Sequence, residues 1–597
     1  MALRVGNSVW AAVAAPLVFG ISAPAGVHAQ TTSGPTRDEL ESKTLPKIRP
    51  QGSRLSVDGG LEYAPCPLAD PSFANVRVTF SQVEFTNLQG IPAAALEDSW
   101  RQFAGKSLPV AEICTIRDRA ATTLRKAGYL AAVQVLPQRI ATDGILKFDV
   151  LMAKLVKIQV KGDAGPSERL IARYLEPLTL QPLFNAVEAE RAILLARDIP
   201  GYDVRLTLRP AGTAPGEVLA EVAVTHQRFE VEANVQNLAG PDTGRFGGLV
   251  GIKINGLTGL GDQTSASVYN TFDIHEQTIV QAGHSFLAGA SGLRLGADIT
   301  YAWTSPTLNP AAPIKSETLV ASFDASFPVI RRQSRNLIVS GGLELVEQEI
   351  KFGPVLLIRD KLRIIYARMD FDQIDPASLS SQTGYSTAEP RWRYGGNVEV
   401  RQGISAFGAS RSCGVGFVNC LPPFTPLSRI EADPTAFVGR ARTYVEFRPT
   451  PNVTFALETR GQYSPNALSS FEEFSAGNYT VGRGYDAGSL LGDSGIGSRA
   501  ELRLFKLQPK SRDNVSAQPF AFFDAARVWN KDRFAPPYVS GRENLYSVGG
   551  GVNVAWGNKA RLSIYAAAPL KTTGLQGSKG DVRILMSLTA KLIPWSR

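Results

Sequence analysis

Apolar and polar residues largely alternate from residue 227 to residue 597. One segment sets Leu319, Ala321, Phe323, Ala325 and Phe327 against Thr318, Ser322, Asp324 and Ser326. An alternation with a period of two predicts β-strands that have one apolar and one polar face. Charged residues on one face of long strands need water, and inside a bilayer that water lies in the lumen of a closed barrel. Soluble β-sandwiches alternate too, so the pattern alone leaves both folds open.

The alternation divides into sixteen predicted strands, and an even number returns both ends of a barrel to one side of the membrane. They lie near residues 227–237, 244–257, 261–271, 276–287, 291–303, 316–328, 334–347, 361–372, 390–404, 436–449, 451–463, 495–507, 517–530, 544–557, 559–568 and 581–592. The connection 373–390 is longer than the periplasmic turn that this count requires. Aromatic residues near the strand ends fit interfacial girdles: Tyr301, Trp303, Tyr366, Tyr444, Trp529, Trp556 and Tyr565.

Residues 76–226 predict two small α+β modules with the same order of elements. The first reads as strand 76–85, helices 93–103 and 110–126, and strands 129–136 and 144–151. The second reads as strand 155–161, helices 168–175 and 186–196, and strands 204–209 and 218–225. A sheet edge beside a helix is a groove where an extended peptide can add by backbone pairing. Spacers without a ligand are the alternative interpretation.

The N-terminal 75 residues predict a secretion signal followed by a linker. Residues 1–29 carry one charge, Arg4, before the apolar stretch 9–21, and Val27-His28-Ala29 offers a small-residue cleavage site before Gln30. Residues 30–75 are rich in proline, serine and glycine, with a short charged stretch at 37–43 that has room for a single short helix. The segment lacks a long helix, which argues against a plug in the pore.

The composition of the chain argues against several classes of function. The 597 residues carry 63 Lys+Arg against 54 Asp+Glu, a net charge of +9 that is interspersed along the chain, so we expect no nucleic-acid partner. The four histidines are scattered and form no cluster with cysteine, which predicts no metal site and no cofactor. No nucleophile–base motif of a known hydrolase is present, so we assign no catalytic residue and expect no enzyme.

Two cysteine pairs predict disulfides, because an exported chain reaches an oxidising compartment. Cys413 and Cys420 lie in the connection 405–436, which the strand count places outside the cell. Cys66 and Cys114 would join the linker to the first module. Free thiols remain the alternative for either pair.

A second long external connection, near residues 464–494, holds Val481-Gly482-Arg483-Gly484-Tyr485-Asp486. An arginine flanked by glycines suggests a hairpin tip that enters a confined space, where its guanidinium needs a carboxylate. Asp524 shares the parity of Phe522 and Ala526 on the next strand but one, so it can face the lumen. From spacing alone, an ordinary glycine loop with Asp524 paired to Arg527 or Lys531 is the simpler interpretation.

These residues resemble the Omp85 superfamily of outer-membrane assembly and secretion barrels. The family's arginine–glycine–aromatic loop folds back into the barrel, and its arginine meets the aspartate of a Phe-x-x-Phe-Asp segment. The resemblance therefore implies a contact among Arg483, Gly484, Tyr485 and Asp524. It also implies a polar wall of lumen-facing Arg499, Glu501 and Arg503.

The modules narrow the resemblance to two-partner secretion transporters, the TpsB group that exports haemolysins and filamentous haemagglutinins. Gly128-Tyr129, Pro137-Gln138 and Gly144 are similar to that group's first POTRA domain. The resemblance implies a signal peptide (1–29), an N-terminal segment and proline-rich linker (30–75), POTRA 1 (76–152), POTRA 2 (153–226) and a 16-stranded transmembrane β-barrel (227–597). The fold class is then α+β followed by membrane all-β.

The implied function is transport without nucleotide across the outer membrane. The POTRA domains, in the periplasm, would bind an unfolded exoprotein client through its N-terminal secretion domain. The client would thread the barrel and fold outside, and outer-membrane lipid would surround the barrel. An Omp85-type insertase that assembles other outer-membrane proteins is the alternative on the same fold.

Overall fold

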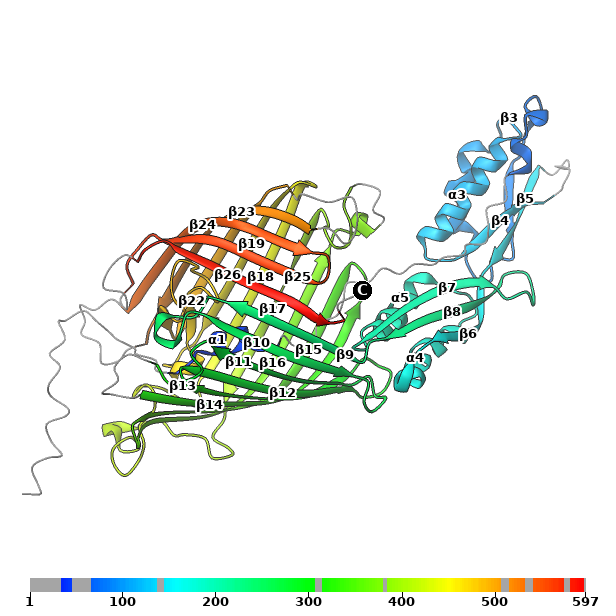
Figure 1. Ribbon diagram of the computed structural model, residues 1–597. Coiled ribbons are helices and arrows are strands. Elements are labelled where there is room, and N and C mark those ends of the chain that lie inside the picture. The colour runs from blue at the N-terminus through cyan, green and yellow to red at the C-terminus, as the bar shows by residue number, and fades with distance from the viewer. Residues whose placement is uncertain are drawn as a thin grey trace, which may run out of the picture.

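The computed structural model describes two small α+β modules that lie in line beside a closed β-barrel (Figure 1). The described residues are 34–45, 66–136, 144–306, 314–379, 384–505, 515–531, 541–573 and 580–594. The predicted signal peptide, residues 1–29, lies outside them, as do Pro137 and Gln138.

The first module has a three-stranded sheet in the order β2-β5-β4, with β2 parallel to β5. Its strands are β1 (Arg77–Val78), β2 (Gln82–Thr86), β3 (Leu108–Pro109), β4 (Ala131–Val135) and β5 (Ile145–Met152). Its helices are η2 (Pro67–Ala69), η3 (Pro71–Phe73), η4 (Ala93–Leu96), α2 (Glu97–Trp100), η5 (Arg101–Phe103) and α3 (Glu112–Lys126). The single strand predicted over 76–85 is wrong, because β1 leaves the sheet to pair with β3.

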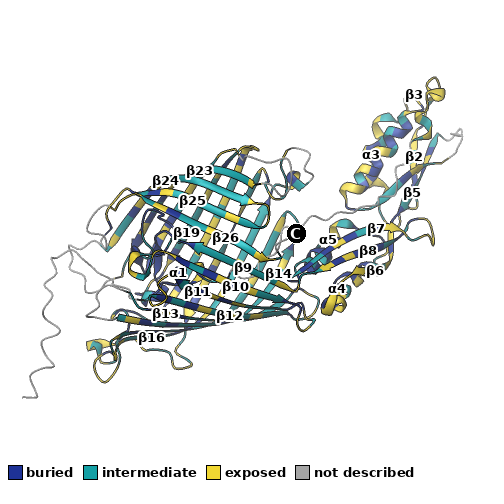
Figure 2. Cartoon of the chain, in the orientation of Figure 1, coloured by how far each residue is buried: buried dark blue, intermediate teal, exposed yellow. Residues whose placement is uncertain are grey.

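The second module repeats this plan with a sheet in the order β6-β8-β7. Its strands are β6 (Lys154–Gly162), β7 (Tyr202–Pro210) and β8 (Glu217–His226), and its helices are η6 (Gly165–Ser167), α4 (Glu168–Leu175), η7 (Glu176–Thr179) and α5 (Ala186–Arg197). Asn185 caps α5 by accepting a hydrogen bond from the amide of Val187. Each module buries its own apolar cluster, and Figure 2 shows buried residues on both the strands and the helices of the modules.

The barrel is closed by sixteen antiparallel strands, as the alternation predicted. The strands are β9 (Phe229–Gln236), β10 (Gly247–Asn255), β11 (Gln263–Thr271), β12 (Gln277–Leu287), β13 (Arg294–Thr304), β14 (Ile314–Arg331), β15 (Arg335–Phe352), β16 (Val355–Ile374), β17 (Trp392–Gly403), β18 (Phe437–Thr450), β19 (Val453–Tyr463), β22 (Ser494–Arg503), β23 (Val515–Trp529), β24 (Arg542–Trp556), β25 (Ala560–Pro569) and β26 (Arg583–Ile593). Pairing of β26 with β9 completes the ring.

The long connection after β16 is real, since β16 pairs directly with β17. It contains η9 (Pro376–Leu379) at the same end of the barrel as the modules. Among the described helices, none is both long and apolar enough to cross a membrane.

Side-chain direction in the barrel follows the alternation. Phe323, Ile365 and Phe455 are exposed on the outer surface, whereas Glu344 and Asp524 are buried inside. Tyr301 and Trp303 lie on the outer face of β13, in register with outward residues of β14. The girdle assignment is wrong for three aromatic residues that have inward partners: Tyr366 lies under Arg401, Tyr444 donates to Asp372, and Tyr565 packs on Phe520 and Phe522.

Five further described elements lie in the N-terminal segment and in the two long external connections. They are α1 (Arg37–Ser42), a hairpin of β20 (Phe474–Ala476) and β21 (Leu490–Gly492) with η11 (Ser470–Glu472) at its base, and η10 (Val415–Phe417) in the first long external connection. A last short helix, η8 (Pro241–Thr243), lies between β9 and β10.

Candidate functional site

The connection between β19 and β22 folds back into the barrel and places its tip, residues 481–486, against the inner wall. The side chains of Phe474, Val481, Tyr485, Leu490 and Leu545 form one buried apolar cluster there. Burial of these groups offsets the conformational entropy that ordering of a long loop costs.

Arg483 is the centre of the tip. Its Nε lies 3.0 Å from Asp524 Oδ2 and its Nη2 lies 2.6 Å from Asp524 Oδ1, a two-pronged ion pair. Its Nη1 donates to Glu501 Oε1 at 2.6 Å, and its guanidinium lies 3.6 Å from the centre of the Phe522 ring. The side chain of Asp524 is 0% exposed. Of the alternative partners of Asp524, Arg527 lies over the Trp529 ring, and the backbone amide of Lys531 donates to Asp493 Oδ2 at 2.7 Å.

The backbone of the tip adds to this contact. The amides of Gly482 and Arg483 donate to Asp524 Oδ2 at 3.3 and 2.9 Å. Gly482 has φ +113°, a backbone conformation that residues with a side chain rarely adopt. A Cβ atom on Gly484 would lie 2.7 Å from the backbone nitrogen of Pro569. The Tyr485 hydroxyl accepts from the amide of Lys571 at 3.1 Å and lies 2.9 Å from the carbonyl oxygen of Tyr546. The glycines therefore let the tip approach the wall closely.

The three lumen-facing residues predicted on β22 lie around this tip. Arg499 donates to the carbonyl oxygen of Asn478 in the loop at 3.0 Å. Glu501 contacts Arg483, and Arg503 reaches Glu446 of β18 at 2.8 Å. All three therefore point to partners inside the barrel.

Helix α1 lies inside the barrel, so the expectation against a helix in the pore is wrong. Arg37 donates to Glu344 Oε1 at 2.6 Å and Oε2 at 3.0 Å and also pairs with Glu472 at the base of the long loop. Asp38 accepts from Arg460 of β19 at 2.8 Å. Leu40 and Leu45 pack on apolar lumenal residues. Six residues suffice because ion pairs to the wall hold a helix too short to be stable alone.

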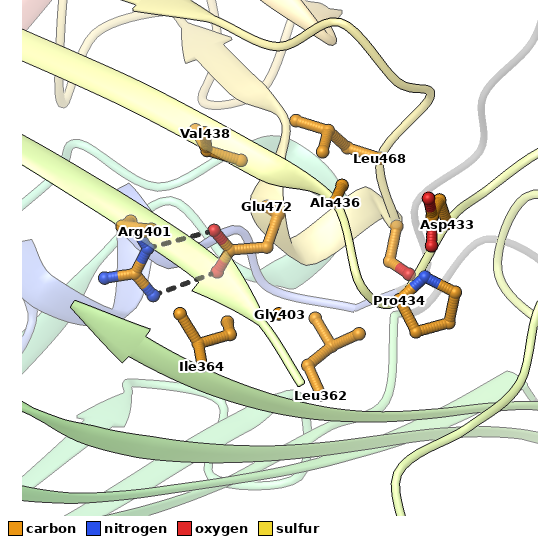
Figure 3. A pocket seen from close by; sticks show the side chains of 11 residues that line it. Leu362, Ile364, Arg401, Gly403, Asp433, Pro434, Ala436, Val438, Leu468 and Glu472 are labelled. Carbon is orange, nitrogen blue, oxygen red and sulfur yellow. Dashed lines mark hydrogen bonds and ion pairs between the residues drawn. The ribbon is translucent and has the colours of Figure 1, made fainter. Parts of the chain in front are cut away.

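A buried ionic cluster joins this helix, the long loop and the wall. Its members, which we call the lumenal cluster, are Arg37, Glu344, Glu399, Arg401, Arg440 and Glu472. Arg401 donates to Glu344 at 2.8 Å, to Glu399 at 3.0 Å and to Glu472 at 3.2 Å. Figure 3 shows Arg401 and Glu472 facing each other beside a small apolar pocket that includes Leu362, Ile364 and Val438. Three arginines and three glutamates thus neutralise one another inside the barrel.

Sequence reasoning missed the lumenal cluster. The signal was present, since Glu344, Glu399 and Arg401 occupy inward positions of strands that alternate. Nothing in the sequence indicated the pairing of these residues with Arg37, because Arg37 and Glu344 are 307 positions apart.

Buried ion pairs join the two external connections to each other. Arg429 of the first connection donates to Asp493 Oδ1 at 2.5 Å and to Glu473 Oε1 at 2.9 Å in the second. Cys413 is joined to Cys420 within the first connection. Movement of the long loop would therefore disturb its neighbour.

The predicted motif of the first module lies at the junction of the two modules. A Cβ on Gly128, which has φ +89°, would collide with the side chain of Asn185. The carbonyl oxygen of Gly128 accepts from the amide of Ala186, and Tyr129 forms an isolated bridge with Asn185. Gly144, with φ +67°, accepts from the amide of Ser81 at 2.7 Å. Cys66 is joined to Cys114 on α3.

The second module is docked to the turn between β14 and β15. Arg331 donates to Asp198 at 2.6 and 2.7 Å, and its side chain is 1% exposed. Arg191 donates to the carbonyl oxygen of Pro328 at 2.8 Å, and Glu190 accepts from the amide of Gln333 at 2.7 Å. The two modules therefore form one arm fixed to the rim of the barrel.

The turn between β10 and β11 is also ordered at this rim. Burial would raise the pKa of Asp262, but hydrogen bonds from the hydroxyl and amide of Thr258 and the amide of Leu257 outweigh burial and hold that pKa below its usual value. Asp262 thus stays ionised and shapes a turn beside the second module, where Pro166 lies against Gly259.

The comparisons with known proteins agree with one another. Residues 361–554 match the family model of the haemolysin secretion/activation protein ShlB/FhaC/HecB. The heme/hemopexin transporter protein HuxB of Haemophilus influenzae is 21% identical over 583 residues, which cover 96% of each chain. HuxB of strain 86-028NP is 24% identical over 268 residues, 44% of this chain and 46% of that relative.

Solved structures share the fold. CdiB from Escherichia coli has a TM-score of 0.65 at 16% identity and covers 90% of this chain and 94% of its own. BamA from Haemophilus ducreyi, lacking POTRA domains 1–3, has a TM-score of 0.50 at 14% identity and covers 86% of this chain and 100% of its own.

Proposed function

Because the chain belongs to the ShlB/FhaC/HecB family of two-partner secretion transporters in the Omp85 superfamily, we propose that its POTRA arm binds an unfolded exoprotein. The arm delivers this client to the pore of the barrel, which α1 and the long loop keep shut. The barrel lies in the outer membrane, and the POTRA domains lie in the periplasm. The client acts as the partner, and its folding outside the cell supplies direction.

The arm suits an extended client. Strand β4 is an edge of the first sheet beside α3, and strand β6 is an edge of the second sheet. An edge strand leaves backbone donors and acceptors on one side, where another strand can pair. Leu136 and Val156, at these edges, are exposed apolar side chains that a client segment would cover.

The observation that carries the proposal is the shared carboxylate of Glu472. It pairs with Arg37 of α1 and with Arg401 and Arg440 of the wall, all inside the barrel. An arriving chain with charged side chains can exchange partners with such a cluster without leaving a buried charge unpaired. Displacement of α1 and movement of the loop are then coupled through one residue.

Comparative proteomics of supernatant and outer membrane, with and without this gene, tests the function. We expect one large secreted protein to disappear from the supernatant while other barrels keep their abundance. Broad loss of outer-membrane barrels would instead establish the alternative, an Omp85-type insertase.

Photo-crosslinking tests the arm. A photoreactive amino acid at position 156 on β6 should capture the client during export, and one at the exposed Leu180 of the same module is the control. Equal capture at both positions would contradict pairing at the β6 edge.

A further inference from the structure

Three neighbouring strands carry an unusual outer surface. β14, β15 and β16 have 18, 18 and 20 residues and extend the barrel wall on the side away from the POTRA arm. Register aligns Phe323, Leu343 and Ile365 in one outward apolar row across the three strands. This row belongs to the band that faces lipid, because Phe323 and Ile365 are exposed.

Beyond this row the outward positions become charged. The strand register defines three successive rows of outward residues that lie farther from the arm, and we call their charged members the charged wall. These members are Lys361 and Glu347 in the first row, Glu317, Glu349 and Arg359 in the second, and Lys315 and Lys351 in the third. Arg363 lies one row nearer the apolar band and is buried, with its Nε donating to the carbonyl oxygen of Phe407.

The charged wall begins at the height of the lipid headgroups. Trp303 pairs in register with Glu317, and Tyr301 pairs with Leu319. The two rings lie 4.4 Å apart, and the Tyr301 hydroxyl donates to Glu317 Oε2 at 3.2 Å. Outward tyrosine and tryptophan mark the boundary between hydrocarbon and headgroups.

The cations of the charged wall have exchangeable partners. Lys351 Nζ lies 3.0 Å from Glu317 and 3.4 Å from Glu349, and Arg359 lies 2.8 Å from Glu349. Lys361 lies 3.8 Å from Glu347, and Lys315 is exposed. Partly exposed ion pairs contribute little, whereas phosphate oxygens form short charge-assisted bonds with lysine and arginine.

The charged wall has seven charged residues on three strands, whereas the outward positions at this end of β23 and β24 carry two, Arg527 and Arg542. At the same end, the exposed outward residues of β19 and β26 include Tyr463 and Ile584, which are uncharged. A general need for solubility outside the membrane would distribute charge around the ring, so a localised ligand explains the pattern better.

We propose that the charged wall binds phosphorylated lipid headgroups of the outer leaflet, with Lys351, Arg359 and Lys361 contacting phosphate oxygens. The apolar row below it continues into the bilayer, so one lipid can place acyl chains on Phe323 and Leu343 and its headgroup on the charged wall. The inference depends on the location in the outer membrane and not on the client.

Binding of defined lipids to the full-length protein in detergent tests the proposal. The probes are diphosphorylated lipid A, the same molecule without phosphates, and inorganic phosphate, measured by native mass spectrometry and by thermal stability. We expect binding of the diphosphorylated form only, and an affinity that falls about fivefold for each cation removed. K351Q/R359Q/K361Q should therefore lower the affinity roughly 100-fold.

Two controls separate a lipid site from an ionic ladder that merely stabilises the strands. E347Q/E349Q removes the competing carboxylates and should keep or raise lipid affinity, whereas loss of binding would overturn the proposal. Arg527→Gln changes an outward residue of β23, in register with outward Ile496, and should have no effect. If the triple variant does not fold, Arg359→Gln alone carries the test.

Two further results would overturn the proposal. One is equal binding of phosphorylated and dephosphorylated lipid A, which would mean that acyl contacts alone hold the lipid. The other is full competition by millimolar inorganic phosphate, which would mean a free-anion site rather than a lipid site.

Discussion

Replacing Asp524 by asparagine should release the tip of the long loop from the barrel wall. The change keeps the shape of the side chain and removes its charge. Arg483 would lose its two-pronged ion pair, now 2.6 and 3.0 Å long, and would keep only Glu501. The variant therefore tests the contact without creating a cavity.

The magnitude follows from burial. Arg483 and Asp524 are 6% and 0% exposed, and removal of one partner from such a pair costs about 3–5 kcal/mol. Glu501 retains part of the attraction, and an asparagine oxygen still accepts from the amide of Arg483. We expect a net loss of about 2–4 kcal/mol, a shift of roughly 30- to 700-fold toward the undocked loop.

The assay measures exposure of the loop in intact cells. Ser489 in the loop is 6% exposed, and Ser489→Cys gives a thiol that a membrane-impermeant maleimide reaches only when the loop undocks. Labelling should rise strongly in the Asp524→Asn background, and export of the client should be lost while the barrel stays in the membrane. Arg527→Gln on the same strand, facing outward, is the matched control.

Normal export with unchanged labelling in the Asp524→Asn variant would refute the reasoning. So would full rescue by the charge swap Arg483→Asp with Asp524→Arg. We expect only partial rescue, because the amides of residues 482 and 483 donate to the carboxylate of Asp524, and a guanidinium offers them no acceptor.

Three other predictions concern the arm and the helix. Arg37→Ala should raise ion conductance of the purified protein in planar bilayers, because it removes the pairs that hold α1; Glu41→Ala, at a side chain 68% exposed, should leave conductance unchanged. Gly128→Ala should loosen the junction between the POTRA domains by about 2 kcal/mol or more, measured by proteolysis there; Gly212→Ala, with similar φ and open space, should show only the backbone strain. Arg331→Ala should free the arm from the barrel and speed hydrogen exchange in α5, and unchanged exchange would contradict docking.

The regular elements followed from the sequence because their pattern is local. Each strand residue of the barrel meets either lipid or water, so the alternation along residues 316–328 is enough to give both the strand and its faces. The helices predicted over 110–126 and 186–196 followed in the same way from helical spacing and are observed over 112–126 and 186–197. Arg483 and Asp524 could be joined in advance only through the family resemblance, since their spacing alone favoured an ordinary loop.

Tertiary structure decided which charges meet. The inward positions of Glu344 and Arg401 follow from alternation, but their contact with Arg37 exists only after the barrel closes and α1 enters it. Likewise, Tyr444 was expected at the membrane boundary by its place near a strand end, yet its parity turns it inward to Asp372. Local pattern fixes the environment of one residue at a time, because solvent or lipid acts on each side chain directly. The choice of partner depends on closure of a ring of sixteen strands around segments far away in the chain, and no period in the sequence records that distance.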